Sequence, residues 1–196
     1  MPTSFEGAAT LAASENELDS EDEERLSERC RHRLFELTGR FHAGNLVTHT
    51  ADGLLQSRPM TLALLDAATE ELGFLTLVDA EVAKDVANDP MVSVVFQDAR
   101  HHVAWSGRAY VDHERYRVAR AWQPELSRWF PEGPEDPHVV LLVVRAIRAE
   151  YWSASVVTGA LRALGVATSA MLTEAEEAPT RHGVVVFGDD GVLTEW

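Results

Sequence analysis

The feature that most constrains the fold is a run of six consecutive aliphatic residues, Val139 to Val144. It is the longest apolar run in the chain, and it is far too short to span a bilayer, which takes about 20 residues. A strand that is apolar at every position is buried on both of its faces. The sequence therefore predicts a sheet that is covered on both sides.

Short β-type segments separated by turn signals flank that run. The tripeptide Ala51-Asp52-Gly53 is a tight-turn signature between two apolar stretches, and it predicts a β-hairpin whose second strand reaches about Leu65. Alternating apolar residues and turn signals mark the other strands. These are expected at residues 72–78, 91–97, 103–111, 139–144 and 147–152, with a terminal hairpin that includes 184–187.

Helical periodicity and capping residues predict three helices, over 21–38, 79–88 and 112–122, with Asp79 and Asp112 as the N-caps of the last two. A fourth helix is expected near 155–164. Antiparallel strands interrupted by short helices indicate an α+β domain whose sheet closes as a barrel.

The chain divides into three expected segments. Residues 1–19 lack apolar periodicity and are rich in acids, as in a disordered arm. Residues 20–152 hold the predicted helices and strands of the barrel domain. Residues 153–196 are expected to be a C-terminal extension that packs on the barrel or on a second subunit.

The formal net charge of −15 restricts the partners that the chain can bind. The first 24 residues hold eight acids and no Lys or Arg, so they lack the basic start of a secretory signal. An acidic surface repels phosphate backbones, which disfavours nucleic acid and anionic membranes as partners. Any anionic ligand must therefore be held by local charges, and the single lysine, Lys84, becomes a residue of interest.

The cysteine count, the histidine spacing and the absence of known motifs argue against several kinds of site. The single cysteine, Cys30, rules out an intrachain disulfide framework and fits a reducing compartment, so a cytoplasmic location is expected. The adjacent residues His101 and His102 point apart in a strand or turn and do not chelate one metal ion easily. The sequence contains no HExxH, GxGxxG, P-loop or Gly-x-Ser-x-Gly motif, which argues against zinc enzymes, Rossmann dehydrogenases, kinases and hydrolases.

Two local patterns are candidates for binding an anion. Pro59 cannot donate to a β-ladder and restricts Arg58 to an extended conformation, in which the guanidinium can bind a phosphate or carboxylate. The strand end at Thr76 leads into a predicted helix that carries Lys84, which resembles a phosphate-binding corner. The alternatives are an arginine on a solvated strand face and a solvated lysine on an ordinary helix.

Taken in order, the motifs of the chain resemble the general stress protein 26 family of the pyridoxamine 5′-phosphate oxidase-like, FMN-binding split-barrel superfamily. The resemblance covers about residues 25–152. The motifs that carry it are Asp52-Gly53, Ser57-Arg58-Pro59-Met60, Phe74-Leu75-Thr76, Lys84, Asn88-Asp89-Pro90, Trp105-Ser106-Gly107, the loop 129–137 and Ala149-Glu150-Tyr151-Trp152.

The resemblance implies a split-barrel homodimer with FMN bound at the subunit interface. It implies that Arg58 and Lys84 bind the FMN phosphate and that Thr76 hydrogen-bonds the phosphate or ribityl chain. By the same resemblance, Gln97 hydrogen-bonds the ring or ribityl chain from the neighbouring strand, and Trp129 packs near the flavin of the other subunit. The cofactor-binding set is completed by Pro59, Met60 and Thr61, which run beside the isoalloxazine, and by Phe74.

The chain departs from the family pattern at two places. Val82 stands where family members usually have a serine two residues before the lysine, and Lys84 follows Thr76 by a longer interval than usual. Glu150-Tyr151-Trp152 is not followed by the Arg-x-His substrate motif of the vitamin B6 oxidases. A true pyridoxamine 5′-phosphate oxidase is therefore not expected.

Three functions fit the sequence. The first is an FMN-dependent oxidoreductase of the general stress type, acting on an unidentified small molecule, in which the flavin carries the hydride and the protein positions it. The second is a non-catalytic module that binds flavin or another ligand. The third is a reductase that uses the deazaflavin F420, whose longer anionic tail calls for more basic residues.

Overall fold

The strands of this protein form one antiparallel sheet that does not follow chain order. The computed structural model describes residues 24–153, 181–188 and 194–195. In those residues the main path of the sheet is β2-β1-β5-β6-β7-β4-β3, with β8 beside β7 and β9 beside β8. The strands are β1 (Ala43–His49), β2 (Leu55–Thr61), β3 (Leu64–Asp66), β4 (Glu71–Leu77), β5 (Met91–Gln97), β6 (His101–Asp112), β7 (Val139–Ser153), β8 (Arg181–Val186) and β9 (Thr194–Glu195).

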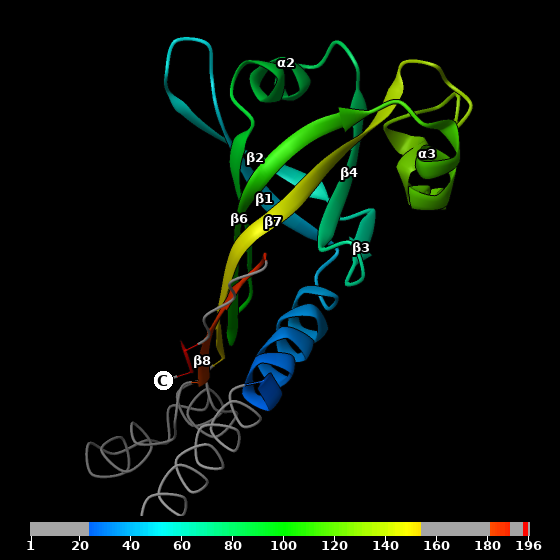
Figure 1. The fold of residues 1–196 in the computed structure, drawn as a ribbon. Helices are drawn as coiled ribbons and strands as arrows, with labels where there is room; N and C mark the ends of the chain where they lie inside the picture. Colours follow the sequence, from blue (N-terminus) through cyan, green and yellow to red (C-terminus); the bar gives the residue numbers. More distant parts are fainter. Residues whose placement is uncertain (1–23, 154–180, 189–193, 196) are drawn as a thin grey trace, which may run out of the picture.

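The sheet curls until its first strand, β2, also contacts β4 on the far side of the path. The result is a curled antiparallel half-barrel with flanking helices, which confirms the predicted split-barrel fold (Figure 1). The segments predicted as an arm over 1–19 and as a helix near 155–164 lie outside the described residues. The predicted terminal hairpin is present as β8 paired with β9.

The predicted hairpin at Ala51-Asp52-Gly53 is confirmed. Strands β1 and β2 pair without a register shift from Ala43 opposite Thr61 to His49 opposite Leu55. Gly53 has a φ of 82°, a left-handed conformation that glycine adopts without steric cost.

The second strand of that hairpin ends earlier than predicted. Strand β2 stops at Thr61, and β3 begins at Leu64. Between them the backbone changes partner, because the Leu62 amide donates to His42 and the Ala63 amide donates to Gly73 of β4. The segment that was predicted as the second strand of the hairpin is therefore divided between two strands, β2 and β3.

Residues 139–144 and 147–152, predicted as two strands, form one strand of 15 residues. The predicted gap between the two segments is only an irregularity within one strand. At that place the register between β7 and β6 shifts between Ser106 and Gly107. A Cβ atom on Gly107 would lie 2.2 Å from the Arg145 carbonyl oxygen, so the two backbones approach each other closely at this bulge.

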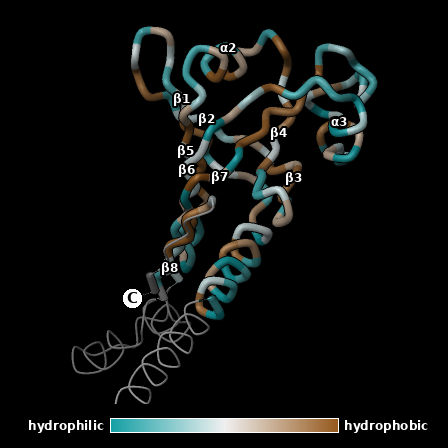
Figure 2. Tube along the Cα trace, in the orientation of Figure 1, coloured by the Kyte–Doolittle hydropathy of each residue, from teal (hydrophilic) through white to brown (hydrophobic). Residues whose placement is uncertain are grey.

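The aliphatic run in β7 is completely buried, as predicted, and it separates two apolar layers. Leu142 and Val144 point into the barrel core, whereas Val139, Leu141 and Val143 pack on the opposite face against the segment 118–130. Apolar residues accordingly follow β7 and β4 (Figure 2). One chain buries this surface by itself, so the run is not available to a subunit interface.

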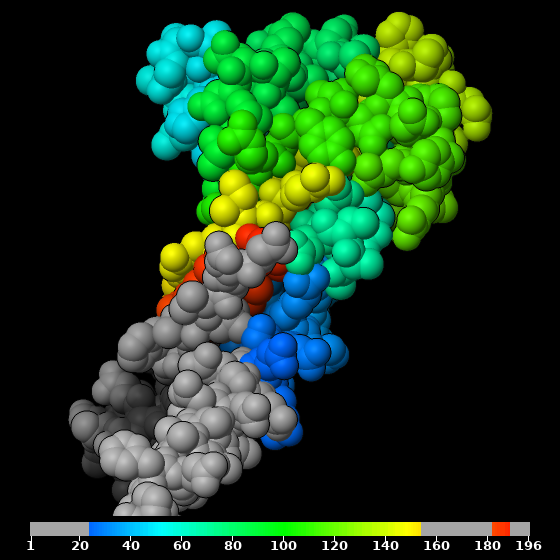
Figure 3. All heavy atoms as spheres, in the orientation of Figure 1, coloured from blue at the N-terminus to red at the C-terminus, as the bar shows by residue number. Residues whose placement is uncertain are grey.

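The helices lie at opposite ends of the half-barrel. The first, over residues 24–38, runs away from the lower end, whereas α2 (Glu81–Asn88) covers the upper end and α3 (Arg115–Ala121) flanks β4 and β7 (Figure 1). A short 3₁₀ helix, η1 (Pro124–Arg128), follows α3. Strand β8 lies beside the 24–38 helix (Figure 3), where Phe187 makes an edge-to-face contact with Phe35.

The predicted N-caps of the two short helices are wrong. The N-cap of α2 is Ala80 and that of α3 is Glu114, and neither side chain makes a capping hydrogen bond. Asp112 instead accepts from the Glu114 amide and pairs with Arg117. Within the described ranges, no helix has the length and apolar character needed to cross a membrane.

Candidate functional site

Arg58 points into the upper end of the barrel. It lies opposite Leu46 in the β1–β2 ladder, and directly opposed residues project from the same face of a sheet. Leu46 is completely buried in the barrel core, and the Arg58 side chain is only 18% exposed. This position contradicts the alternative of an arginine on a solvated strand face.

The Arg58 guanidinium already has three partners. Its Nη1 donates to Thr48 Oγ1 at 2.7 Å, and its Nη2 donates to Gln56 Oε1 at 2.7 Å. The same Nη2 lies 2.8 Å from Asp85 Oδ2 on α2. Thr48 Oγ1 also donates to Asp85 Oδ2 at 2.9 Å, so the arginine, the threonine and the carboxylate form one buried network.

Lys84 is the neighbour of Asp85 on α2, but its side chain lies on the solvent side of the helix. The side chain is 60% exposed, and Nζ pairs with Glu81 Oε1 at 2.8 Å. The hydrogen bond that Lys84 donates to the Glu81 carboxylate raises the pKa of Lys84. Arg58 therefore contacts the buried, barrel-facing side of α2, whereas Lys84 faces solvent, and each cation is paired with its own carboxylate.

Thr76 and Phe74 lie on the inner face of β4. Phe74 is completely buried in the barrel core, so its side chain supports the wall and does not contact a ligand. Thr76 follows on the same face at the strand end that leads to α2, and it is 6% exposed. No described residue offers its hydroxyl a hydrogen bond, which leaves this group available at the same end of the barrel as Arg58.

Pro59 and Thr61 lie on an open edge of the sheet. The Leu62 amide donates to His42, and the Leu54 carbonyl accepts from Thr50, so the even-numbered residues of this strand bond to β1. By alternation, the backbone groups of Pro59 and Thr61 face away from β1, where no described strand pairs with β2. The missing N–H of Pro59 therefore falls on the free edge, as predicted, and Met60 packs against the core.

Gln97 and Trp129 do not join Arg58 in the described chain. Val94 aligns with Arg58 across β1, and Gln97 lies three residues further, about 10 Å along β5 and on the opposite face. Its side chain is exposed. Trp129 is 69% exposed, and its ring lies 5.9 Å from the Arg128 guanidinium carbon.

The groups at the upper end of the barrel suit the phosphate and the ring of a flavin. Three donor contacts occupy Arg58, and its remaining N–H groups have no partner among the described residues. The free Thr76 hydroxyl and the open edge of β2 add further polar groups. Asp85 and Glu81 act against this fit, because both place negative charge beside the cations that a phosphate would use.

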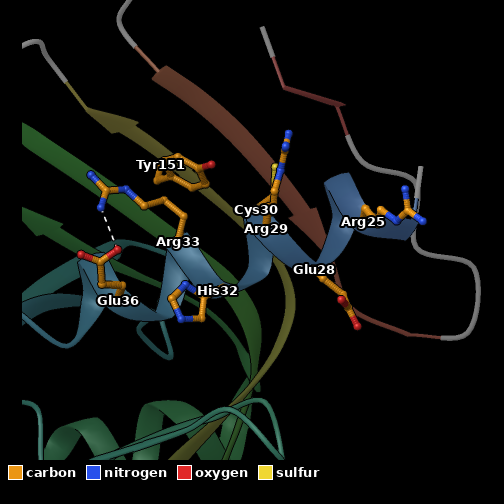
Figure 4. A pocket seen from close by; sticks show the side chains of 8 residues that line it. All are labelled: Arg25, Glu28, Arg29, Cys30, His32, Arg33, Glu36 and Tyr151. Carbon is orange, nitrogen blue, oxygen red and sulfur yellow. Dashed lines mark hydrogen bonds and ion pairs between the residues drawn. The ribbon is translucent and has the colours of Figure 1, made fainter. Parts of the chain in front are cut away.

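A large hollow lies elsewhere in the described chain. It has a volume of about 1020 Å³ and opens along the 24–38 helix, with Tyr151 at its wall (Figure 4). Arg33 pairs there with Glu36 at 2.7 Å. No sequence-predicted site residue lines this hollow, whose described wall consists of Arg25, Glu28, Arg29, Cys30, His32, Arg33, Glu36 and Tyr151.

A second charged cluster, which the sequence reasoning missed, surrounds Glu71 at the lower end of β4. The buried carboxylate accepts from Arg117 at 2.7 Å and from Tyr110 and Arg145 at 3.1 Å. Burial raises the pKa of Glu71, but the hydrogen bonds from Arg117, Arg145 and Tyr110 outweigh it and hold the pKa below its ordinary value. Arg117 also pairs with Asp112, so the cluster ties α3 to the sheet.

Asp85 is the site residue that the sequence reasoning overlooked. It lies between Val82 and Val86 on the apolar face of α2, and all three are buried. A charged residue at a helix position that periodicity assigns to the core was the available signal. Among the described residues, no group of three or more His, Cys, Asp or Glu side chains gathers to hold a metal ion.

A match to a family model over most of the chain shows the family. The model described as pyridoxamine 5′-phosphate oxidase like matches residues 30–177. The chain belongs to this family. The matched range includes β1 to β7, and with them Arg58 and α2.

Known relatives agree with this assignment. Protein bli-3 of Neurospora crassa is 28% identical over 109 residues. The matched segment covers 50% of this chain, and the chain spans about half (52%) of the length of that relative. A general stress protein 26 from a Jannaschia species superposes with a TM-score of 0.63 at 22% identity, covering 82% of this chain and 99% of that one. An FMN-binding, pyridoxamine 5′-phosphate oxidase-related protein from Nostoc punctiforme gives a TM-score of 0.52 at 14% identity, covering 86% and 93%. The likenesses to the two solved structures show the split-barrel fold.

Proposed function

We propose that this chain binds FMN at the upper end of its half-barrel, with Arg58 as the main ligand of the phosphate. The observation that carries the proposal is an arginine inside the barrel end, 18% exposed, with N–H groups that no described residue uses. Charge-assisted hydrogen bonds to a phosphate contribute about 1.5–3 kcal/mol each. Membership of the family and the FMN-binding Nostoc relative support the same ligand.

The other residues of the site position the ligand. Thr76 offers its hydroxyl to the phosphate or the ribityl chain, and Lys84 approaches the phosphate after leaving Glu81. The backbone of Pro59 and Thr61 borders the ring along the open edge of β2. Bound FMN supplies a hydride acceptor and donor, so the site suits an oxidoreductase that acts on a small molecule, of the kind expected for a general stress protein.

A non-catalytic flavin-binding module is the second candidate. It is favoured by the buried carboxylate of Asp85, because a site that opposes its own phosphate ligand suits reversible uptake of flavin. The F420 alternative fits less well, because Asp85 and Glu81 oppose a longer anionic tail. A homodimer stays part of the proposal, with Gln97 and Trp129 as residues that a partner subunit would bring to the flavin.

Titration of flavin fluorescence with the purified protein tests the proposal. FMN is expected to bind with one site per chain, and Arg58→Lys, which keeps the charge but loses the planar fork, is expected to bind it about tenfold more weakly. Arg100→Ala, at an exposed turn, is the control and leaves binding unchanged. Equal affinity for FMN in the Arg58→Lys variant and the wild type would remove Arg58 from the site.

Reduction of the bound flavin separates the enzyme from the carrier. An oxidoreductase is expected to lose its flavin absorbance with NADH or NADPH and to recover it when an electron acceptor is added. A flavin that stays oxidised with both donors while bound to the protein supports the binding module.

A further inference from the structure

Asp85 is a buried charge whose position the proposed function does not explain. Its side chain is 7% exposed and lies on the face of α2 that packs against the barrel. Taking a carboxylate out of water costs several kcal/mol unless it is paired and hydrogen-bonded. Arg58 and Thr48 supply that pairing, so the carboxylate is fixed in place next to the guanidinium.

The two carboxylates at the site differ in how easily they can move. Glu81, the partner of Lys84, is 75% exposed, and both side chains of that pair can separate into water at little cost. Asp85 has no such freedom, because it is enclosed between α2 and the β1–β2 hairpin. A phosphate that reaches Arg58 therefore meets the negative charge of Asp85 at close range.

The phosphate of FMN carries close to two negative charges at neutral pH. One of these charges is balanced if Arg58 is fully available, but Arg58 is already neutralised by Asp85. The repulsion grows with the charge of the incoming group and is strong at short range in a partly buried site. A phosphate ester with a single negative charge suffers less from it.

We propose that Asp85 is a specificity-determining residue, which orients the Arg58 guanidinium and selects against doubly charged phosphates, so that this protein holds its flavin as a dissociable ligand. This inference rests on the proposed function. It predicts that flavin exchanges freely between protein and solution. It also predicts that a flavin phosphodiester with one negative charge binds at least as tightly as FMN.

The variant Asp85→Asn separates the charge of this residue from its role in packing. The asparagine has nearly the same shape, and its carbonyl oxygen still accepts from Arg58 and Thr48. The matched control is Glu28→Gln, which changes the net charge equally at an exposed position on the 24–38 helix, at the opposite end of the barrel. The dissociation constants of FMN and of riboflavin, which lacks the phosphate, are measured by fluorescence for each protein.

The expected result is an increase of about tenfold in the affinity of Asp85→Asn for FMN, with riboflavin affinity unchanged and with no effect of Glu28→Gln. Unchanged or weaker FMN binding by a folded Asp85→Asn overturns the inference while leaving FMN binding by the wild type intact. If neither protein binds FMN or riboflavin, the proposed function fails and the inference fails with it.

A second measurement needs no variant and covers the case in which Asp85→Asn does not fold. The wild-type protein is titrated with FMN and with its phosphate monomethyl ester, which carries one negative charge. Equal or tighter binding of the ester supports selection against the second charge. Binding of the ester tenfold weaker than FMN overturns the inference.

Discussion

Arg58 and Asp85 form a buried ion pair, so each is expected to depend on the other for its contribution to stability. Removing one partner of a buried ion pair leaves the other charge unpaired, which costs about 3 kcal/mol or more. We expect Arg58→Ala to lower the free energy of unfolding by about this amount, measured by urea denaturation. The double variant Arg58→Ala/Asp85→Asn is expected to recover at least half of the loss, because no unpaired charge remains. Equal stability of the single and double variants would contradict the pairing.

The contribution of Glu71 to the stability of the fold is expected to depend on pH. Its pKa is held below the ordinary value of 4.5, so its hydrogen-bonded charge stabilises the fold above that pH, and the contribution is lost as the pH falls through the lowered pKa. Glu71→Gln is expected to cost about 1–3 kcal/mol in urea at pH 7, and the difference from the wild type should shrink towards pH 3.

Glu36→Gln is the control for this prediction. Glu36 also has a lowered pKa, because its side chain accepts a hydrogen bond from Arg33, but that pair lies at the surface. Surface pairs contribute about 0–1 kcal/mol, so this variant should change stability little. A loss at pH 7 as large as that of Glu71→Gln would show that burial of Glu71 is not the cause.

At the scale of elements, the bulge between β6 and β7 depends on a glycine. A Cβ atom at position 107 would lie within 3.0 Å of two backbone atoms of Arg145, which cannot move without displacing β7. We expect Gly107→Ala to lower the free energy of unfolding by about 1–3 kcal/mol. The control is Ser106→Ala, at the exposed neighbouring position. Chemical denaturation of both variants is the measurement, and equal stability would mean that the strands can separate here without cost.

The elements show what the sequence could and could not predict. Alternation and turn residues were enough for the β1–β2 hairpin and for β5, because both depend on nearest neighbours in the chain. The division of β2 from β3 and the continuity of β7 were missed, since both depend on partners far away in sequence. The capping of α2 by Ala80 also escaped prediction, because the preceding Asp79 is the better capping residue by type alone.

In the candidate site, too, the features that were missed depend on contacts between residues far apart in sequence. The sequence predicted the helix that carries Lys84, and the structure confirms this helix as α2. The joint binding of one phosphate by Arg58 and Lys84 came only from the family resemblance and stays a prediction. The sequence did not reveal that Asp85 neutralises Arg58, because the contact depends on how α2 docks against β1 and β2. Nor did it show that Gln97 lies on the opposite face from Arg58, which follows from the register of β5.

At the scale of the whole molecule, a second subunit is expected to cover exposed apolar surface. The aliphatic run of β7 is used within one chain, so a homodimer must use other apolar side chains. Trp129 and Tyr116 are 69% and 67% exposed, and both lie in the segment that follows β6. Large exposed aromatic side chains are typical of interfaces.

We expect light scattering at micromolar concentration to give twice the 21.7 kDa of one chain. We also expect Trp129→Ser to weaken both dimerisation and FMN binding, because in the proposed dimer the partner subunit completes the flavin site. Leu54→Ser, a comparable loss of exposed apolar surface at the tip of the β1–β2 hairpin, is the control and should leave FMN binding unchanged. A monomer that binds FMN as tightly as the proposed dimer would show that Arg58, Thr76 and the edge of β2 form a complete site within one chain.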